Sequence, residues 1–330
     1  MKNILLATLS LFLSLGLTMS PKGTTHKTAI KLPVYSHIVI VIEENKDYDQ
    51  IIGNAAAPYI NNVLKKEGAN FTHSYAEEHF SEGNYFWLLS GNDQGVGHLD
   101  ITPTRSNNKN YPFKTCNLGE QLIKKGYTFK GYSESLPAIG DTISRAGYYA
   151  RKHVPWISFA NIPNGKNIES SSNLPFKQFP KDFNKLPTVS IVVPNLIHDM
   201  HNGRPPKSIK DGDKWLKDNL NNYYQWAKTH NSLLIITFDE NSDKAHYWGY
   251  TNPASKNHSI RNRIPTIIAG AHVKPGNYAE GKGITHVNIL RTIEAMYGLQ
   301  KCGHQQANAL KFGISNNYVI KDIFSKSILR

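Results

Sequence analysis

The chain has 330 residues, of which 39% are apolar and 11% aromatic, and this is enough material for a large buried core. One α/β domain and two smaller domains are both compatible with that length. The formal net charge is +13, and the lysines behind it are scattered along the chain, which excludes a single basic arm. Such a surface attracts anions in general, from phosphate esters to anionic lipids and nucleic acid. No signature of a dedicated nucleic-acid-binding module accompanies it.

The N-terminus has the pattern of a signal peptide. Met1-Lys2-Asn3 is a short basic start, and Ile4 to Leu17 is an apolar run too short to span a bilayer comfortably. We therefore expect residues 1–20 to be removed on export, to a secreted or periplasmic location in a bacterium, and residues 21–330 to form one catalytic domain. An uncleaved N-terminal anchor is the alternative. No later stretch is long and apolar enough to predict a membrane span in the mature chain.

Two cysteines occur, Cys116 and Cys302. In an oxidising compartment they could form one disulfide that closes a long loop. Two separate buried thiols are the alternative. Neither cysteine has the C-x-x-C spacing of a metal or redox site, so the pair predicts no chemistry of its own.

β-branched runs predict strands, and amphipathic stretches predict helices. In chain order the predicted strands are His37–Ile42, Tyr127–Tyr132, Thr188–Val193, Leu233–Phe238 and Ile264–Ala269. The predicted helices are Pro58–Gly68, Asn84–Ser90, Asn117–Gly126, Asp213–His230 and Thr285–Tyr297. The polar stretches Asn161–Asn173 and Asn202–Asp213 predict long surface loops. Strands that alternate with helices predict an α/β fold with a mostly parallel central sheet and helices on both faces.

Two of these strands end in adjacent acidic residues followed by asparagine, at Glu43-Glu44-Asn45 and Asp239-Glu240-Asn241. Ligands of an open parallel sheet bind beyond the carboxyl ends of its strands. If both strands lie near the switch in strand order, their carboxylates converge, and converging carboxylates need protons or a cation to coexist at neutral pH. A hard divalent ion with oxygen ligands meets that need.

Ser81 lies just ahead of the short aromatic helix that begins at Asn84. A serine in this place could be a plain N-cap of that helix. Alternatively, the free backbone N–H groups of the helix start favour an anion, and a metal beside the hydroxyl would turn it into a nucleophile for phosphorus.

Taken together and in this order, the segments resemble the bacterial phosphoesterase family. The resemblance rests on Ile42-Glu43-Glu44-Asn45, Ser81-Glu82-Gly83-Asn84-Tyr85, Pro194-Asn195 with Asp199-Met200-His201, and Phe238-Asp239-Glu240. It extends from about His37 to Leu299. The family includes secreted acid phosphatases and phospholipases C, and its fold is similar to that of alkaline phosphatase. The resemblance therefore implies a metal-dependent phosphoric-ester hydrolase.

The family's metal ligands fall on Glu44, Asn45, Asp239 and Glu240, together with the nucleophile Ser81. The resemblance implies a divalent ion but leaves open whether it is Ca, Mg, Mn or Zn. Glu43 is then an extra acidic residue that points away from the ion. The expected reaction is an in-line attack of the serine on phosphorus, with a phosphoserine intermediate that water then hydrolyses.

Three further residues carry over to the phosphate side of the site. Asn84 falls where the family has a donor to the phosphate oxygens, and His153 and His201 fall near the phosphate, one of them as proton donor to the leaving oxygen. Gly83 stands where many relatives have a proline, which could loosen this loop without removing a reacting group. His258 is a weaker candidate, as ligand of a second metal.

The substrate class stays open at this level. A phosphatase acting on phosphomonoesters, including phosphoinositides, is favoured over a phospholipase C because the lipid-cleaving relatives carry extra C-terminal domains and this chain ends soon after Leu299. Phospholipid head groups remain possible partners. A secreted metal- and anion-binding protein without activity is the non-enzymatic alternative. A nucleic-acid-binding surface protein would show a steep salt dependence of binding, and net charge alone supports it.

Overall fold

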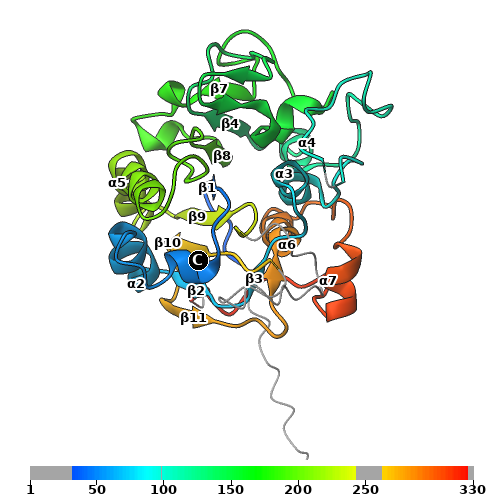
Figure 1. Cartoon of the computed structure of the whole chain (residues 1–330). Coiled ribbons are helices and arrows are strands. Elements are labelled where there is room, and N and C mark those ends of the chain that lie inside the picture. The colour runs from blue at the N-terminus through cyan, green and yellow to red at the C-terminus, as the bar shows by residue number, and fades with distance from the viewer. Residues whose placement is uncertain (1–31, 98, 243–261, 326–330) are drawn as a thin grey trace, which may run out of the picture. The chain divides into compact units, whose positions relative to one another are not determined.

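The computed structural model describes residues 32–97, 99–242 and 262–325, which belong to one compact unit. The predicted signal segment 1–20 and His258 lie outside these ranges. The central sheet has eight strands in the order β11-β2-β10-β9-β1-β8-β4-β7 (Figure 1). Their bounds are β1 (His37–Glu43), β2 (Ala69–Phe71), β4 (Phe129–Ser133), β7 (Asn173–Pro175), β8 (Val189–Val193), β9 (Ser232–Phe238), β10 (Thr266–Gly270) and β11 (Gly276–Tyr278).

The strands run mostly in one direction, as predicted. β9, β1, β8, β4 and β7 form a continuous parallel block, and β11 pairs in parallel with β2. Within the described sheet, β10 is the strand that runs antiparallel to its neighbours. β1 therefore lies inside the parallel block, covered on both edges by hydrogen bonding and on both faces by helices.

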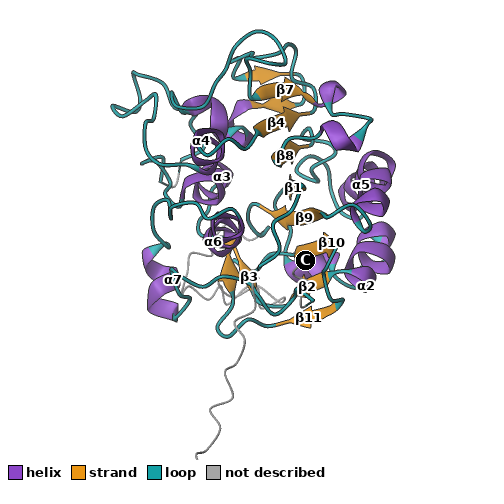
Figure 2. Ribbon diagram, turned by 180° about the vertical axis from the view of Figure 1, so that it is seen from behind, coloured by secondary structure: helices purple, strands orange, loops and turns teal. Residues whose placement is uncertain are grey.

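Helices cover the two faces of the sheet (Figure 2). On one face lie α3 (Ser81–Ser90), α4 (Leu118–Lys124) and α6 (His286–Met296). On the other lie α5 (Lys207–Ala227) and a helical segment formed by η1 (Ile60–Leu64) and α2 (Lys65–Glu67). The β-branched run of β1 supplies both cores by alternation, with Ile38, Ile40 and Ile42 packing beside α3 and Val39 and Val41 beside α5.

Shorter elements complete the described part of the chain. The helical ones are α1 (Tyr48–Ile51), η2 (Arg151–His153), η3 (Pro155–Ser158), η4 (Phe176–Gln178), η5 (Phe183–Lys185) and α7 (Ala307–Phe312). Two small sheets pair β3 (Ser74–Tyr75) with β12 (Ile284–Thr285) and β5 (Arg145–Ala146) with β6 (Tyr149–Ala150). None of the described helices is both long enough and apolar enough to cross a bilayer.

The main discrepancy with the predicted elements is the start of α5. The helix begins at Lys207, so the second half of the predicted loop Asn202–Asp213 is wrong. Gly212 weakens the helical pattern in the sequence, yet the fold requires a residue without a side chain there. A Cβ at Gly212 would lie 2.5 Å from the Met200 Cγ and 2.9 Å from the His198 carbonyl oxygen.

A disulfide joins Cys116, just before α4, to Cys302, after α6. The open alternative of two separate thiols is thereby excluded. Gly91, which ends α3, fits tightly against this region, because it has a φ of +61° and a Cβ there would lie 2.3 Å from the Cys302 carbonyl oxygen. A left-handed conformation with no room for a side chain selects glycine.

Candidate active site

The acidic ends of β1 and β9 meet. The strands pair in parallel with Glu43 opposite Phe238, so the residues that follow them emerge side by side. The backbone N–H of Asp239 donates to the Glu43 carbonyl oxygen at 2.9 Å, and the Asn45 N–H donates to Asp239 Oδ1 at 2.9 Å. The Glu44 N–H donates to the Asp199 carbonyl oxygen at 2.7 Å, which brings in the loop after β8. The predicted convergence of carboxylates is therefore present.

Ser81 points at these carboxylates and does not cap its helix. α3 begins at Ser81 itself, and the N-cap residue is Phe80, which has no capping side chain. The Ser81 Oγ donates to Glu44 Oε2 at 3.1 Å and to Glu240 Oε1 at 3.3 Å. One buried hydroxyl is thus held between carboxylates from two strand ends, and the N-cap interpretation is wrong.

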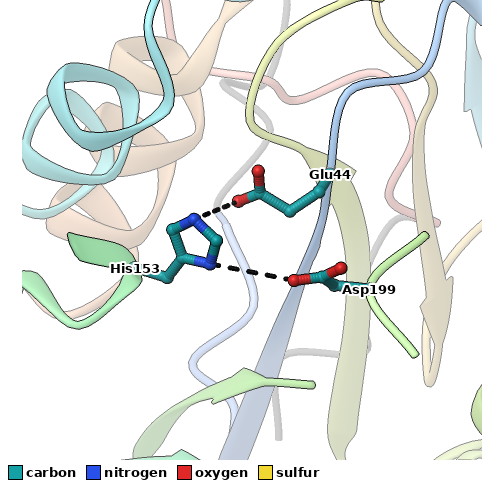
Figure 3. A group of neighbouring side chains, drawn as sticks. All are labelled: Glu44, His153 and Asp199. Carbon is teal, nitrogen blue, oxygen red and sulfur yellow. Dashed lines mark ion pairs between the residues drawn. The ribbon is translucent and has the colours of Figure 1, made fainter. Parts of the chain in front are cut away.

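The carboxylate of Glu44 contacts two stacked side chains, Tyr85 and His153. The Tyr85 hydroxyl donates to Glu44 Oε1, and the Tyr85 ring stacks on the His153 ring with centroids 5.0 Å apart and planes inclined by 4°. Figure 3 shows His153 between two carboxylates, its Nε2 3.3 Å from Glu44 Oε1 and its Nδ1 3.7 Å from Asp199 Oδ2. These three residues each offer one ligand atom within 4.8 Å of the others, the geometry of a possible metal site.

The buried carboxylates do not favour full ionisation by themselves. Burial raises the pKa of Glu44 well above its ordinary value, and the neighbouring Asp239 and Asp199 carboxylates raise it further. Burial likewise raises the pKa of Asp199 and of Glu240, with Asp239 adding to both shifts. At neutral pH this group therefore needs a cation or bound protons.

A divalent cation fits the residues present. Asp199 Oδ2 and Asp239 Oδ2 are buried and have no hydrogen-bond partner among the described residues. Buried carboxylate oxygens without donors are costly unless a cation or a proton satisfies them. The donors that converge are carboxylate oxygens, a hydroxyl and an imidazole, a set that Ca, Mg, Mn or Zn can use in different combinations.

A cavity of about 410 Å³ opens in front of Ser81. Of the predicted site residues, it is lined by Ser81, Asn45, Glu240 and His201; the remaining lining residues are Lys46, His79, Phe80, Asp100, Lys152, Asn241 and Ser242. Ser81, the carboxylate of Glu240 and two histidines therefore face the same space.

The two candidate histidines occupy different places. His153 is completely buried, does not line the cavity, and burial lowers its pKa well below the ordinary value. His201 lines the cavity, and its Nδ1 is 2.9 Å from Asn202 Oδ1, so Nε2 is the ring nitrogen left for proton transfer. His201 is therefore the better placed of the two for proton donation, and His153 lies with the carboxylates.

The predicted role of Asn84 as a donor to phosphate oxygens does not agree with the structure. Its Oδ1 accepts from the N–H groups of Glu77 and Glu78, both at 3.0 Å. Its Nδ2 donates to the carbonyl oxygens of Glu78 at 2.8 Å and Phe80 at 3.3 Å. An amide has two donors and two acceptor sites, so all are used to fold the segment ahead of Ser81.

Glu43 and Gly83, which the sequence pattern also marks, have structural explanations. Glu43 is fully buried, and alternation along β1 directs it to the α5 side, away from Ser81, as expected. At Gly83, a Cβ would lie 2.9 Å from Glu78 Oε2, so any larger residue requires that carboxylate to move.

Some residues of the site have only a weak signal in the sequence. Tyr85 belongs to the segment from Ser81 that resembles the family, but it also lies in an aromatic run typical of core, and the sequence assigns no definite role to Lys152 or His79. The His79 Nδ1 contacts Glu240 Oε2, and the Lys152 Nζ contacts Asp100 Oδ2 at 2.5 Å. Adjacency to Ser81 and His153 in the sequence is the available signal for His79 and Lys152, whereas Asp100 lies in a polar loop with no pattern around it.

Comparisons with known proteins identify the family of the chain. A model of the Phosphoesterase family matches residues 56–300, more than half of the chain. A phosphatidylinositol-3-phosphatase of Mycobacterium tuberculosis is 45% identical over 278 residues, which cover 84% of this chain and 81% of that protein. A probable acid phosphatase of Kluyveromyces lactis is 27% identical over 293 residues, and the match covers 83% of this chain but 61% of that longer protein.

The fold has a counterpart among solved structures. A protein of the alkaline phosphatase superfamily from Vibrio parahaemolyticus superposes with a TM-score of 0.54 at 13% identity, covering 87% of this chain and 71% of the other. At that identity the likeness concerns the fold alone, and it confirms the expected alkaline-phosphatase-like α/β architecture. With the family match over most of its length, the chain belongs to the phosphoesterase family and is a phosphoric-ester hydrolase.

Proposed function

We propose that the chain is an exported, metal-dependent phosphomonoesterase in which the Ser81 hydroxyl attacks phosphorus. The observation that carries this proposal is the setting of the Ser81 Oγ, which faces the cavity and donates to Glu44 at 3.1 Å and to Glu240 at 3.3 Å. A serine held in this way has acceptors for its proton and space beside it for a phosphate group.

Glu44, Asn45, Asp239 and Glu240 would hold the metal together with Ser81, and His153 and Asp199 extend this set beside Glu44. When bound, a divalent cation neutralises the carboxylates, lowers the pKa of the serine hydroxyl and balances charge on the phosphate. The support is the convergence of these ligand atoms, together with the buried Oδ2 atoms of Asp199 and Asp239, which have no hydrogen-bond partner among the described residues.

The reaction then proceeds through a covalent intermediate. The Ser81 proton passes to one of its carboxylate acceptors as the Oγ–P bond forms and the bond from phosphorus to the leaving oxygen breaks. His201 donates the proton that the leaving oxygen needs. Burial lowers the pKa of His201, so its acidic form predominates at acid pH, where we expect activity. Water then hydrolyses the phosphoserine to free serine and inorganic phosphate.

Phosphomonoesters, with phosphoinositides among them, are the proposed substrates. The support is the 45% identity to a protein named phosphatidylinositol-3-phosphatase. Release of phosphate from a water-soluble short-chain phosphatidylinositol 3-phosphate, compared with p-nitrophenyl phosphate, tests this part directly. A phosphoinositide hydrolysed no faster than the simple ester would reduce the proposal to a broad phosphomonoesterase.

Export is proposed on two grounds. The N-terminal sequence has the basic start and apolar run of a signal peptide, and Cys116 is bonded to Cys302, which requires an oxidising compartment in most organisms. Mass spectrometry of the protein recovered from the periplasm and the medium tests this. The mature N-terminus should lie near residue 21, and an intact Met1 in membrane fractions would contradict export by cleavage.

The activity itself is tested with p-nitrophenyl phosphate and three proteins. The wild type should turn over, and Ser81→Ala should lose nearly all turnover while melting at a similar temperature. Ser90→Ala is the matched control, because Ser90 is another buried serine of α3 whose hydroxyl bonds to backbone near the helix end. It should keep its turnover. Faster hydrolysis of bis-p-nitrophenyl phosphate would instead favour the phospholipase C alternative.

A further inference from the structure

The cavity in front of Ser81 needs a positive group for the phosphate, and the predicted donor Asn84 is fully engaged elsewhere. Among the described residues that line the cavity, the lysines are Lys46 and Lys152. A phosphate dianion entering a space lined by the carboxylates of Asp100 and Glu240 meets like charge unless cations offset it. The environment of each lysine decides which one is available.

Lys46 is not available. Its side chain is buried, and its Nζ donates to the carbonyl oxygens of Met200 at 2.7 Å, Asn45 at 3.2 Å and Glu44 at 3.5 Å. An ammonium has three protons, and backbone acceptors take all of them. Lys46 therefore fastens the end of β1 to the loop after β8 and has no donor left for a ligand.

Lys152 has donors to spare. Among the described residues, Asp100 Oδ2 is the acceptor that its Nζ reaches, at 2.5 Å, so two protons of the ammonium remain. The side chain is 21% exposed and lines the cavity, so those protons are accessible to a ligand there. Partly exposed ion pairs of this kind contribute little to folding stability, which leaves function as the better explanation of the arrangement.

Asp100 ties this lysine to the helix of the nucleophile. Its Oδ2 accepts from Lys152, and its Oδ1 accepts from the backbone N–H of Glu82 at 3.1 Å. Glu82 directly follows Ser81 in the first turn of α3. One carboxylate therefore fixes the ammonium in relation to the serine that attacks phosphorus.

We propose that Lys152 is a phosphate-binding residue: its ammonium donates to a non-bridging oxygen of the phosphate that Ser81 attacks, and Asp100 is the residue that positions it. This inference rests on the proposed function and identifies the group that replaces Asn84 as oxygen donor. Charge-assisted hydrogen bonds to an anion are about twice as strong as neutral ones, so loss of this lysine should weaken phosphate binding strongly.

The test measures binding of inorganic phosphate to the metal-loaded protein. Calorimetry in the Ser81→Ala background reports binding without turnover, and the competitive inhibition constant reports it in the active enzyme. Lys152→Met should raise both constants by about ten- to hundredfold, and Lys152→Arg should recover part of the loss. Asp100→Asn should raise KM more than it lowers kcat. Lys124→Met is the matched control, because Lys124 is an exposed lysine of α4, and it should change neither constant for phosphate.

Lys152→Gln is a second variant, which retains an N–H donor in a shorter side chain and removes the positive charge. If both the Met and Gln variants fold and bind phosphate within about twofold of the wild type, the proposal is overturned. It is also overturned if the Ser81→Ala protein does not bind phosphate at all. Absence of ester hydrolysis by the wild type would instead refute the proposed function, since phosphate binding is measured separately.

Discussion

The Asn45 N–H donates to Asp239 Oδ1 at 2.9 Å, and this bond fastens two strand ends that lie 194 positions apart in the sequence. Asp239 in turn donates its own N–H to the Glu43 carbonyl oxygen at 2.9 Å. These two hydrogen bonds, one of them to the Asp239 side chain, hold the acidic ends of the two strands together without a ligand. The site is preorganised by the parallel pairing of β1 with β9, and a bound cation would find its carboxylates already assembled.

Tyr85→Phe should lower kcat. The hydroxyl that is removed donates to the carboxylate of Glu44, which itself accepts from Ser81, while the remaining ring can still stack on His153. Loss of one buried hydrogen bond to a charged group should lower kcat by about ten- to hundredfold, with little change in melting temperature.

Tyr149→Phe is the matched control for that variant, because the Tyr149 hydroxyl is buried but has no hydrogen-bond partner among the described residues. Steady-state kinetics of both variants on p-nitrophenyl phosphate check the expectation. Equal activity of the Tyr85 and Tyr149 variants would show that Glu44 needs no support from Tyr85.

Removal of metal should abolish turnover. The converging carboxylates and the unpartnered Asp239 Oδ2 predict that dialysis against a chelator lowers activity at least about a hundredfold, and that one of Ca, Mg, Mn or Zn restores it. Asp239→Asn should weaken the affinity for that ion by more than about tenfold. Full turnover in chelator, with no metal detected by elemental analysis, would contradict the role assigned to the carboxylates.

Glu43→Gln is the control for the Asp239 variant. Glu43 is as deeply buried as Asp239 and adjoins a proposed ligand, but it points to the α5 side of the sheet. Metal affinity of this variant should stay within about threefold of the wild type. A larger loss would mean that Glu43 belongs to the ion's environment.

The free energy of unfolding should decrease as the pH rises, because His286 loses a proton that stabilises the folded state. Its Nδ1 is 2.6 Å from Glu77 Oε2 and its Nε2 is 2.8 Å from the Phe238 carbonyl oxygen, so a doubly protonated ring satisfies both acceptors. Burial alone lowers the pKa of His286, but the Glu77 carboxylate and the hydrogen bonds outweigh it, and the net pKa is raised.

A histidine pKa raised by folding stabilises the native state fully below the unfolded value of about 6.5, and this contribution is lost as pH rises through the folded value. Urea unfolding from about pH 6 to pH 9 should therefore show a steeper loss of stability in the wild type than in His286→Gln. If the free energy of unfolding of both proteins changed with pH in the same way, His286 would not be doubly protonated in the folded protein.

Loss of the disulfide should affect stability more than activity. Cys116 and Cys302 are 186 positions apart, so their bond closes a long loop of the unfolded chain, and neither cysteine lines the cavity. The double variant Cys116→Ser/Cys302→Ser should lose roughly 2–5 kcal/mol of unfolding free energy and keep most of its turnover at 25 °C. An unchanged urea midpoint would show that the bond does not constrain the native fold.

The sheet and the convergence of the acidic residues at its strand ends can be predicted from the sequence, because both follow from local patterns. Continuous β-branched runs are typical of strands buried on both faces, and parallel neighbours bring their carboxyl ends to one edge. Glu44 and Asp239 were therefore located by the strands that carry them. The start of α5 was missed because Gly212 lowers helix propensity locally, whereas contact with Met200 decides in favour of glycine.

The remainder of the site depends on tertiary packing that no local pattern encodes. Asn84 matched a motif, but its amide is consumed by the backbone of Glu77–Phe80, a use that is visible only once the chain is folded. The Lys152–Asp100 pair joins residues 52 positions apart with no periodic relation. His153 and His201 carry the same expectation from the sequence, and only the folded structure separates them, because His201 lines the cavity whereas His153 is buried between Glu44 and Asp199.

The most direct test of the central claim is to trap the intermediate. Metal-loaded enzyme mixed with substrate and quenched in acid within milliseconds should carry one phosphate on the hydroxyl of Ser81, identified by tandem mass spectrometry of the peptide that contains it. The Ser81→Ala protein should carry none. Label on another residue, or full turnover without any covalent phosphate, would contradict attack by Ser81.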